Sequence, residues 1–241
     1  MTDNFLHALV ATLSTGPVGF SDALGFTNAS LVKSTCASDG ALLKPSLPLA
    51  AIDRTFSIRS NNSAGVAPPV PALGHVWATH TTAADLTWWF VLAITVPEPW
   101  RLLRTDLYPV LPLSEQVVVY DHRDPIGTAQ LIQANESVLW EIRTPAAKRG
   151  YHGFQYLVIA PLIPTSDGWF LLGELAKLTP VSEQRGWSFD LAEGFLLKIL
   201  SAAPGENVTV SAWKGGKVQT KSTVADDRGE APIMFGHSNA I

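Results

Sequence analysis

The strongest constraint on the fold is a series of short segments, each rich in β-branched and aromatic residues, that begins near residue 75. The series includes residues 75–82 (HVWATHTT), 86–96 (LTWWFVLAITV), 116–121 (QVVVYD), 128–134 (TAQLIQA) and 137–143 (SVLWEIR). Such segments are typical of β-strands when turn-forming residues separate them. We therefore predict a mainly β protein in which residues 76–241 form an antiparallel β-sandwich.

Turn-forming residues divide the rest of this region into pairs of strands. The stretch 156–181 reads as a hairpin whose turn lies at residues 165–168, and residues 189–200 hold a further strand pair. A Pro-Gly-Glu-Asn turn at 204–207 and a Gly-Gly turn at 215–216 bound the last predicted strands. Glycine and proline favour these positions because tight turns need backbone conformations that other residues resist.

The first part of the chain has a different pattern. Residues 5–14 are apolar and alternate poorly, which favours a strand buried on both faces, followed by a loop at Gly16, Pro17 and Gly19. Asn28 is a predicted N-cap for a helix over residues 29–38, which includes Cys36 as a small core residue. Strand, loop and helix together predict one βα unit.

These patterns predict three regions. Residues 1–58 form an incomplete βα unit, because a parallel strand needs neighbouring strands that this segment lacks. Residues 59–75, rich in proline, serine and asparagine, form a linker. Residues 76–241 form the sandwich.

Composition excludes several classes of partner. The formal net charge is −4 and there is no basic stripe, so we expect no nucleic acid partner. The longest apolar stretches, 88–96 and 156–163, are shorter than the ~18 residues of a membrane span, so we expect no membrane insertion. The first residues include an acidic side chain and only a short apolar run, which argues against a signal peptide.

The cysteine and asparagine content gives conflicting indications of compartment. Cys36 is the only cysteine, so no internal disulfide forms. Yet four Asn-x-Ser/Thr sequons occur, at Asn28, Asn61, Asn135 and Asn207. Seven asparagines in a chain with about 15% serine plus threonine would give roughly one by chance. The localisation therefore stays undetermined.

No motif for nucleotide, metal or nucleophilic chemistry is present. The chain contains no P-loop, no Gly-x-Gly-x-x-Gly after a strand and no Gly-x-Ser-x-Gly elbow, and its six histidines are scattered. We expect no cofactor and no metal. In the cluster YDHRD, residues 120–124, an Asp-Arg ion pair in a loop is favoured over a metal site. The eight tryptophans favour core packing, with a sugar-stacking platform as the alternative.

Asp22 is the candidate binding residue of the first region. It follows the predicted strand and the Gly16 loop, and loops at the carboxyl ends of parallel strands are where barrel enzymes bind substrate. A turn or capping role is the alternative. Position in the predicted βα unit, more than residue type, favours a substrate-binding role for Asp22 and Gly16.

Residues 9–56 resemble part of a known family. The shared features are the small-residue loop at Gly16, Ser21-Asp22 followed by Gly25, a leucine-containing helix, Asp39-Gly40 with Leu43, and Asp53 three residues before Phe56. In these features the chain resembles the raffinose synthases and seed imbibition proteins, relatives of the α-galactosidases. The position before Pro48, where that family has arginine, is Leu47 here.

The resemblance implies the last unit of a (β/α)8 barrel, followed by the C-terminal sandwich of a glycoside hydrolase. A retaining glycosidase needs two carboxylates about 5 Å apart. In the resembled family both lie on earlier barrel strands, so we expect no catalytic residue here, binding of carbohydrate through Asp22 and Gly16, and a missing barrel portion as partner. The alternative is a non-enzymatic β-sandwich module that binds carbohydrate or protein.

Overall fold

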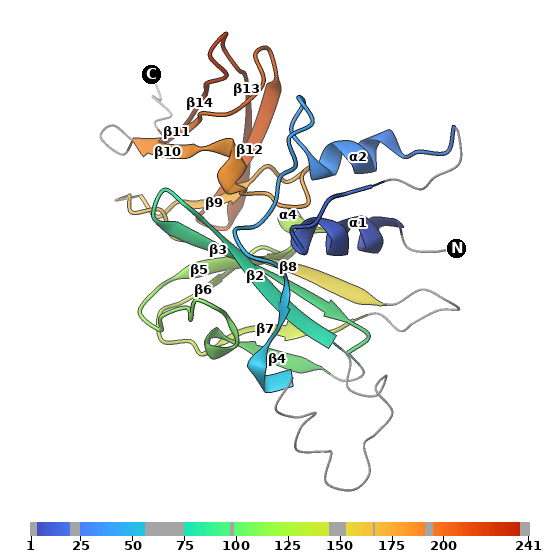
Figure 1. Cartoon of the computed structure of the whole chain (residues 1–241). Coiled ribbons are helices and arrows are strands. Elements are labelled where there is room, and N and C mark those ends of the chain that lie inside the picture. Colours follow the sequence, from blue (N-terminus) through green and yellow to red (C-terminus); the bar gives the residue numbers. More distant parts are fainter. Residues whose placement is uncertain are drawn as a thin grey trace, which may run out of the picture.

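The chain folds around a six-stranded antiparallel sheet with the order β1-β2-β3-β8-β5-β6 (Figure 1). The computed structural model describes residues 4–19, 25–55, 75–96, 99–144, 153–165, 167–190 and 195–236. The strands of this sheet are β1 (Ala50–Ala51), β2 (His75–Ala83), β3 (Leu86–Ile94), β5 (Val117–Asp121), β6 (Gln130–Ile132) and β8 (Phe154–Pro161).

The central strands of this sheet are buried on both faces. In β3, Trp88 and Phe90 point into one hydrophobic core, while Trp89 and Val91 point into a second core on the opposite face. β5 and β8 divide their side chains in the same way. Two covered faces explain why these strands are continuous apolar runs, because alternation appears only where one face meets water.

Two three-stranded antiparallel sheets cover the first face. Their strand orders are β10-β11-β14 and β13-β12-β9, with bounds β9 (Phe170–Gly173), β10 (Trp187–Asp190), β11 (Phe195–Ile199), β12 (Asn207–Lys214), β13 (Lys217–Val224) and β14 (Ala231–Phe235). Buried polar tips join the layers: Trp88 Nε1 donates to the Leu171 carbonyl at 2.8 Å, and the Tyr120 hydroxyl donates to that of Leu172 at 2.8 Å. The prediction of a mainly β, antiparallel, sandwich-like fold is confirmed.

A two-stranded sheet and its loops cover the second face. β4 (Trp100–Leu103) pairs with β7 (Val138–Ile142), and the short 3-10 helix η3 (Arg104–Asp106) follows β4. The buried Arg104 donates to the backbone carbonyls of Glu136, Pro112 and Gln133 at 2.6, 2.8 and 3.1 Å. A buried guanidinium stays in place when carbonyls satisfy its donors, so Arg104 fixes the loops around it.

The strand predicted over residues 5–14 is wrong, because this segment is the helix α1 (Asn4–Leu13). Leu6, Leu9 and Leu13 recur at spacings of three and four residues, which is the period of a helix face, and all three are buried in the first core. The described residues before residue 29 therefore contain no strand, and the predicted strand–loop–helix unit is not formed by them.

The second helix agrees with its predicted start. α2 (Ala29–Thr35) begins after the N-cap Asn28, whose Oδ1 accepts from the backbone nitrogens of Ser30 and Leu31. It ends three residues earlier than predicted, with Cys36 as a half-buried C-cap. Figure 1 shows α1 and α2 along one side of the molecule, with the chain after α2 running on to the six-stranded sheet.

Predicted hairpins are correct where the turn alone determines the pairing. The hairpin predicted at Gly215 and Gly216 joins β12 to β13. The structure adds a hairpin between β2 and β3, which join through Ala84 and Asp85, both with positive φ. The hairpin predicted over 156–181 is wrong: β8 and β9 belong to different sheets, and one bridge, between Leu162 and Phe170, links the described residues around the turn. The predicted linker lies mainly outside the described residues.

A buried ionic cluster connects the three-stranded sheets with the segment after α2. Arg185, in the 3-10 helix η4 (Glu183–Arg185), donates to Glu174 at 2.8 and 2.9 Å and to Glu206 at 2.8 and 3.0 Å. Glu206 also accepts from the backbone nitrogens of Ala203 and Ser38. The cluster thus ties residue 38 to residue 206.

The helices that the structure describes are all too short or too polar to cross a membrane.

Candidate functional site

A hollow of about 510 Å³ lies at the edge of the six-stranded sheet where β1 ends. We call it the β1 hollow. It is formed by three segments that are far apart in the sequence, which contribute Leu47, Pro48, Ala50, Ala51, Ile52, Asp53 and Arg54, then Ala78, Thr79 and His80, then Thr105, Asp106, Leu107, Tyr108 and Val110. Its volume lies within the ~300–1,000 Å³ range of small-molecule sites.

Backbone hydrogen bonds set the first wall of the hollow. β1 pairs with β2 so that Ala50 faces Ala78, and the Ile52 nitrogen donates to the Val76 carbonyl at 3.3 Å. The chain then makes one helical turn that presents the exposed Asp53. No hydrogen bond or ion pair engages the Asp53 carboxylate within the described residues. This carboxylate is therefore available as a hydrogen-bond acceptor.

The charge of Arg54 is compensated within the hollow. Its Nη2 lies 2.6 Å from Asp106 Oδ2, and its guanidinium carbon lies 4.0 Å from the centre of the Trp100 ring. Asp106 also accepts from the Leu103 nitrogen at 2.8 Å. Among the described lining residues Arg54 is the one lysine or arginine, and it is paired, so these residues offer no unpaired cation to an anion such as phosphate.

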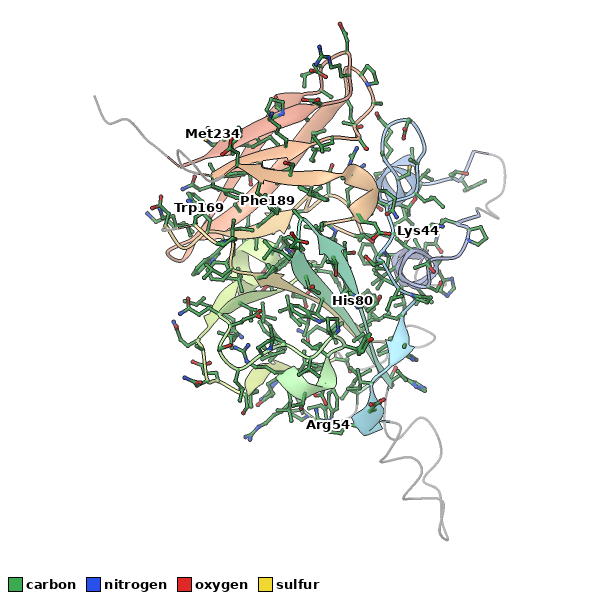
Figure 2. All side chains as sticks on the ribbon, turned by 60° about the vertical axis from the view of Figure 1, so that its left-hand side comes forward. Lys44, Arg54, His80, Trp169, Phe189 and Met234 are labelled. Carbon is green, nitrogen blue, oxygen red and sulfur yellow. The ribbon has the colours of Figure 1, made fainter. Side chains whose placement is uncertain are left out.

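His80 supplies a neutral polar group. Burial lowers its pKa from the usual 6.5, although a hydrogen bond with the Tyr108 backbone and the charge of Glu183 act in the opposite direction. Near neutral pH this imidazole is uncharged, and because its N–H donates to the Tyr108 backbone, the other ring nitrogen remains as a hydrogen-bond acceptor. Figure 2 shows His80 close to β1, on the side of the molecule where Arg54 lies farther along.

Tyr108 provides an exposed aromatic ring at the same place. It is 73% exposed, and its ring approaches His80 edge-on with centroids 6.0 Å apart. The loop that carries it is held from both sides, because Trp89 Nε1 donates to the Pro109 carbonyl at 2.9 Å and Arg104 donates to that of Pro112. The ring is therefore exposed on a loop whose backbone is fixed.

A second hollow of about 680 Å³ lies beyond the same loop. It is lined by Asp85, Leu86, Thr87, Trp89, Pro109, Val110, Pro112, Ser114, Glu115, Gln116, Ala134, Pro161, Leu162 and Pro164. Four prolines contribute no donor, and its two charged groups are both carboxylates. The β1 hollow combines donors, acceptors and an exposed ring, so it is the stronger candidate for a ligand site.

The residues predicted from the sequence are not brought to the β1 hollow. Asp22 lies outside the described residues, and Gly16, half-buried in the loop after α1, lines neither hollow. Their substrate-binding role stays a prediction. However, Asp53, one of the residues behind the family resemblance, lines the β1 hollow together with Leu47 and Pro48.

The other sequence candidates have structural roles. In residues 120–124 the described ion pairs do not include the predicted Asp-Arg pair; Asp124 instead caps the short helix α4 (Pro125–Thr128), and the Arg123 guanidinium lies over the Phe154 ring. Five tryptophans, Trp88, Trp89, Trp169, Trp187 and Trp213, are buried core residues. Within the described residues no three histidine, cysteine or acidic side chains gather as a metal site would require.

The sequence held a weak signal for the residues that form the β1 hollow. The charged pair Asp53-Arg54 interrupts an otherwise apolar stretch, and the aromatic Tyr108 directly precedes Pro109. Comparison of the chain with models of known protein families and with curated proteins finds no match.

Proposed function

We propose that this chain is a carbohydrate-binding, non-catalytic part of an α-galactoside-processing protein, and that the β1 hollow binds the sugar. The observation that carries the proposal is the combination, in one hollow, of the free Asp53 carboxylate, the neutral His80 and the exposed Tyr108 ring. A sugar offers hydroxyl groups to donors and acceptors and an apolar ring face to an aromatic side chain. The three groups match both features.

The charge balance of the hollow favours a neutral ligand. Arg54 is neutralised by Asp106, and Asp53 adds one negative charge that an anionic ligand would meet. Desolvating a second anion beside an unpaired carboxylate is unfavourable, whereas sugar hydroxyls donate to it. The resemblance of residues 9–56 to α-galactosidase relatives supports an α-galactoside as the first ligand to test.

Binding without catalysis is supported by the ion pairing of the described acidic side chains, because paired carboxylates are not poised for hydrolysis. Hydrolysis with retention needs an ionised nucleophile and a neutral acid whose pKa is raised. Glu174 and Glu206 are close enough to share one arginine, but they are buried and ion-paired, and the pKa of Glu206 is lowered to about 2. Asp106 is likewise occupied by Arg54.

The test is calorimetric titration of the full chain with raffinose and melibiose, with cellobiose as the comparison sugar. We expect saturable binding of the α-galactosides that Tyr108→Ala weakens about tenfold, since a ring that covers ~60 Å² of sugar contributes ~1.5 kcal/mol. Tyr108→Phe keeps the ring and should retain most of the affinity. The same preparation should release no aryl alcohol from an aryl α-galactoside.

Phe26→Ala is the matched control, because Phe26 is 79% exposed and does not line the hollow. If Phe26→Ala weakens binding as much as Tyr108→Ala, the sugar site lies elsewhere. If the chain binds none of the sugars, the proposal is wrong.

A further inference from the structure

Three of the four sequons lie within the described residues, and all three present an exposed asparagine. Asn28 precedes α2, Asn135 lies in the turn between β6 and β7, and Asn207 is the first residue of β12. Four sequons exceed the roughly one expected from composition. From these positions we propose that Asn28, Asn135 and Asn207 are acceptors of N-linked oligosaccharide.

The amide nitrogen needed for this modification is free at each site. The side-chain bonds of Asn28 all end on Oδ1, which accepts from the Ser30 nitrogen at 3.1 Å, the Ser30 hydroxyl at 2.7 Å and the Leu31 nitrogen at 3.2 Å. Glycan attachment at Nδ2 therefore leaves the helix cap intact. For Asn135 and Asn207, no side-chain hydrogen bond forms within the described residues.

Asn135 and Asn207 lie at exposed positions in a turn and at a strand end, respectively. Asn135 has φ of 71°, a left-handed conformation found in turns, and its backbone nitrogen donates to the Leu113 carbonyl, which anchors the turn. Asn207 stands opposite Val224, itself 62% exposed, at the end of the β12–β13 hairpin. None of the three asparagines is among the residues that line the β1 hollow.

The proposed step is transfer of an oligosaccharide from a lipid-pyrophosphate donor in the secretory lumen. The bond between the anomeric carbon and the pyrophosphate oxygen breaks, and a bond from that carbon to Nδ2 forms. Nδ2 gives up one proton, and the lipid pyrophosphate leaves. No oxidant or reductant is consumed.

The experiment is translation of the full chain behind a cleavable secretory leader in the presence of microsomes, scoring only protease-protected molecules. All chains carry Asn61→Gln, because that sequon lies outside the described residues. We expect three glycans that an N-glycosidase removes, and the loss of one glycan with each of Asn28→Gln, Asn135→Gln and Asn207→Gln.

Two controls separate the sequon from other effects. Ser137→Ala should remove the Asn135 glycan while Ser137→Thr keeps it, because either hydroxyl residue completes the sequon. Asn4→Gln, outside any sequon, should change nothing. A protected chain without glycans overturns the proposal, and a protected chain with fewer than three overturns it for each site that carries none.

Discussion

At the scale of single residues, Arg185 stands out as a fully buried cation whose charge is balanced by two buried carboxylates. It is fully buried, donates to two carboxylates and thereby joins η4 to the loop before β12. Burial alone would lower the pKa of Arg185, but the hydrogen bonds that it donates to Glu206 and Glu174 outweigh that effect and raise it. Removing this guanidinium would leave two buried carboxylates facing each other without a counter-ion.

We predict that Arg185→Met lowers the free energy of unfolding by about 3–5 kcal/mol, the usual loss when one partner of a buried ion pair is removed. Urea denaturation measures it. Arg143→Met is the control, since Arg143 is mostly exposed in its pair with Glu141 and such pairs contribute about 1 kcal/mol or less. Equal losses in the two variants would contradict a central role for the cluster.

Glu206 makes the stability of the fold depend on pH in the acid range. Burial would raise its pKa, but hydrogen bonds from Arg185 and the Ala203 nitrogen prevail and lower it from 4.5 to about 2. A carboxyl whose pKa is lower in the folded state stabilises the fold fully above its unfolded pKa, and this contribution disappears as pH falls. We therefore expect the free energy of unfolding to fall between about pH 4.5 and pH 2.

Urea titrations across this range, with Glu206→Gln as the comparison, isolate the contribution of this carboxyl. The variant cannot titrate at this position, so its stability should change less steeply with pH. Parallel curves for the two proteins would assign the acid sensitivity to other groups.

At the scale of elements, α1 shows where the sequence could be interpreted in two ways. An apolar run of about ten residues suits either a buried strand or a buried helix, and the run alone does not decide between them. The spacing of Leu6, Leu9 and Leu13 identifies the helix, whose buried face joins the same core as β3 and β8. A strand would have placed these leucines on both of its faces.

We predict that Leu9→Ala lowers the free energy of unfolding by about 2–5 kcal/mol, because Leu9 is fully buried in the first core. Val10→Ala is the control on the same helix, since Val10 is 39% exposed and should change stability by only about 0.5 kcal/mol. Chemical denaturation measures both. A small effect of Leu9→Ala would mean that α1 does not contribute to the core.

Most strands could be predicted because they are rich in β-branched and aromatic residues and are separated by turn-forming residues. β2, β3, β12 and β13 are β-branched or aromatic segments, and for β12 and β13 the Gly215-Gly216 turn also determines the pairing. β8 and β9 could not be assigned to separate sheets, because a turn near Gly168 is compatible with either arrangement. The outcome depends on contacts with distant strands: β8 pairs with β3 and β5, and β9 pairs with β12.

At the scale of the whole molecule, the β1 hollow depends on long-range packing. Asp53, His80 and Tyr108 come together because β1 joins the edge of β2 and the loop after η3 is held by Trp89 and Arg104. No local pattern in any one of these segments indicates the other two. The sequence therefore predicts the mainly β architecture but not this site.

Sugar binding in the β1 hollow can be tested residue by residue by amide chemical-shift mapping of the ¹⁵N-labelled chain during titration with raffinose. We expect the largest shifts at residues 47–54, 78–80 and 105–110, with saturation that Tyr108→Ala weakens about tenfold. Shifts concentrated on another surface, such as β12 and β13, or no saturable shift at all, would contradict the claim.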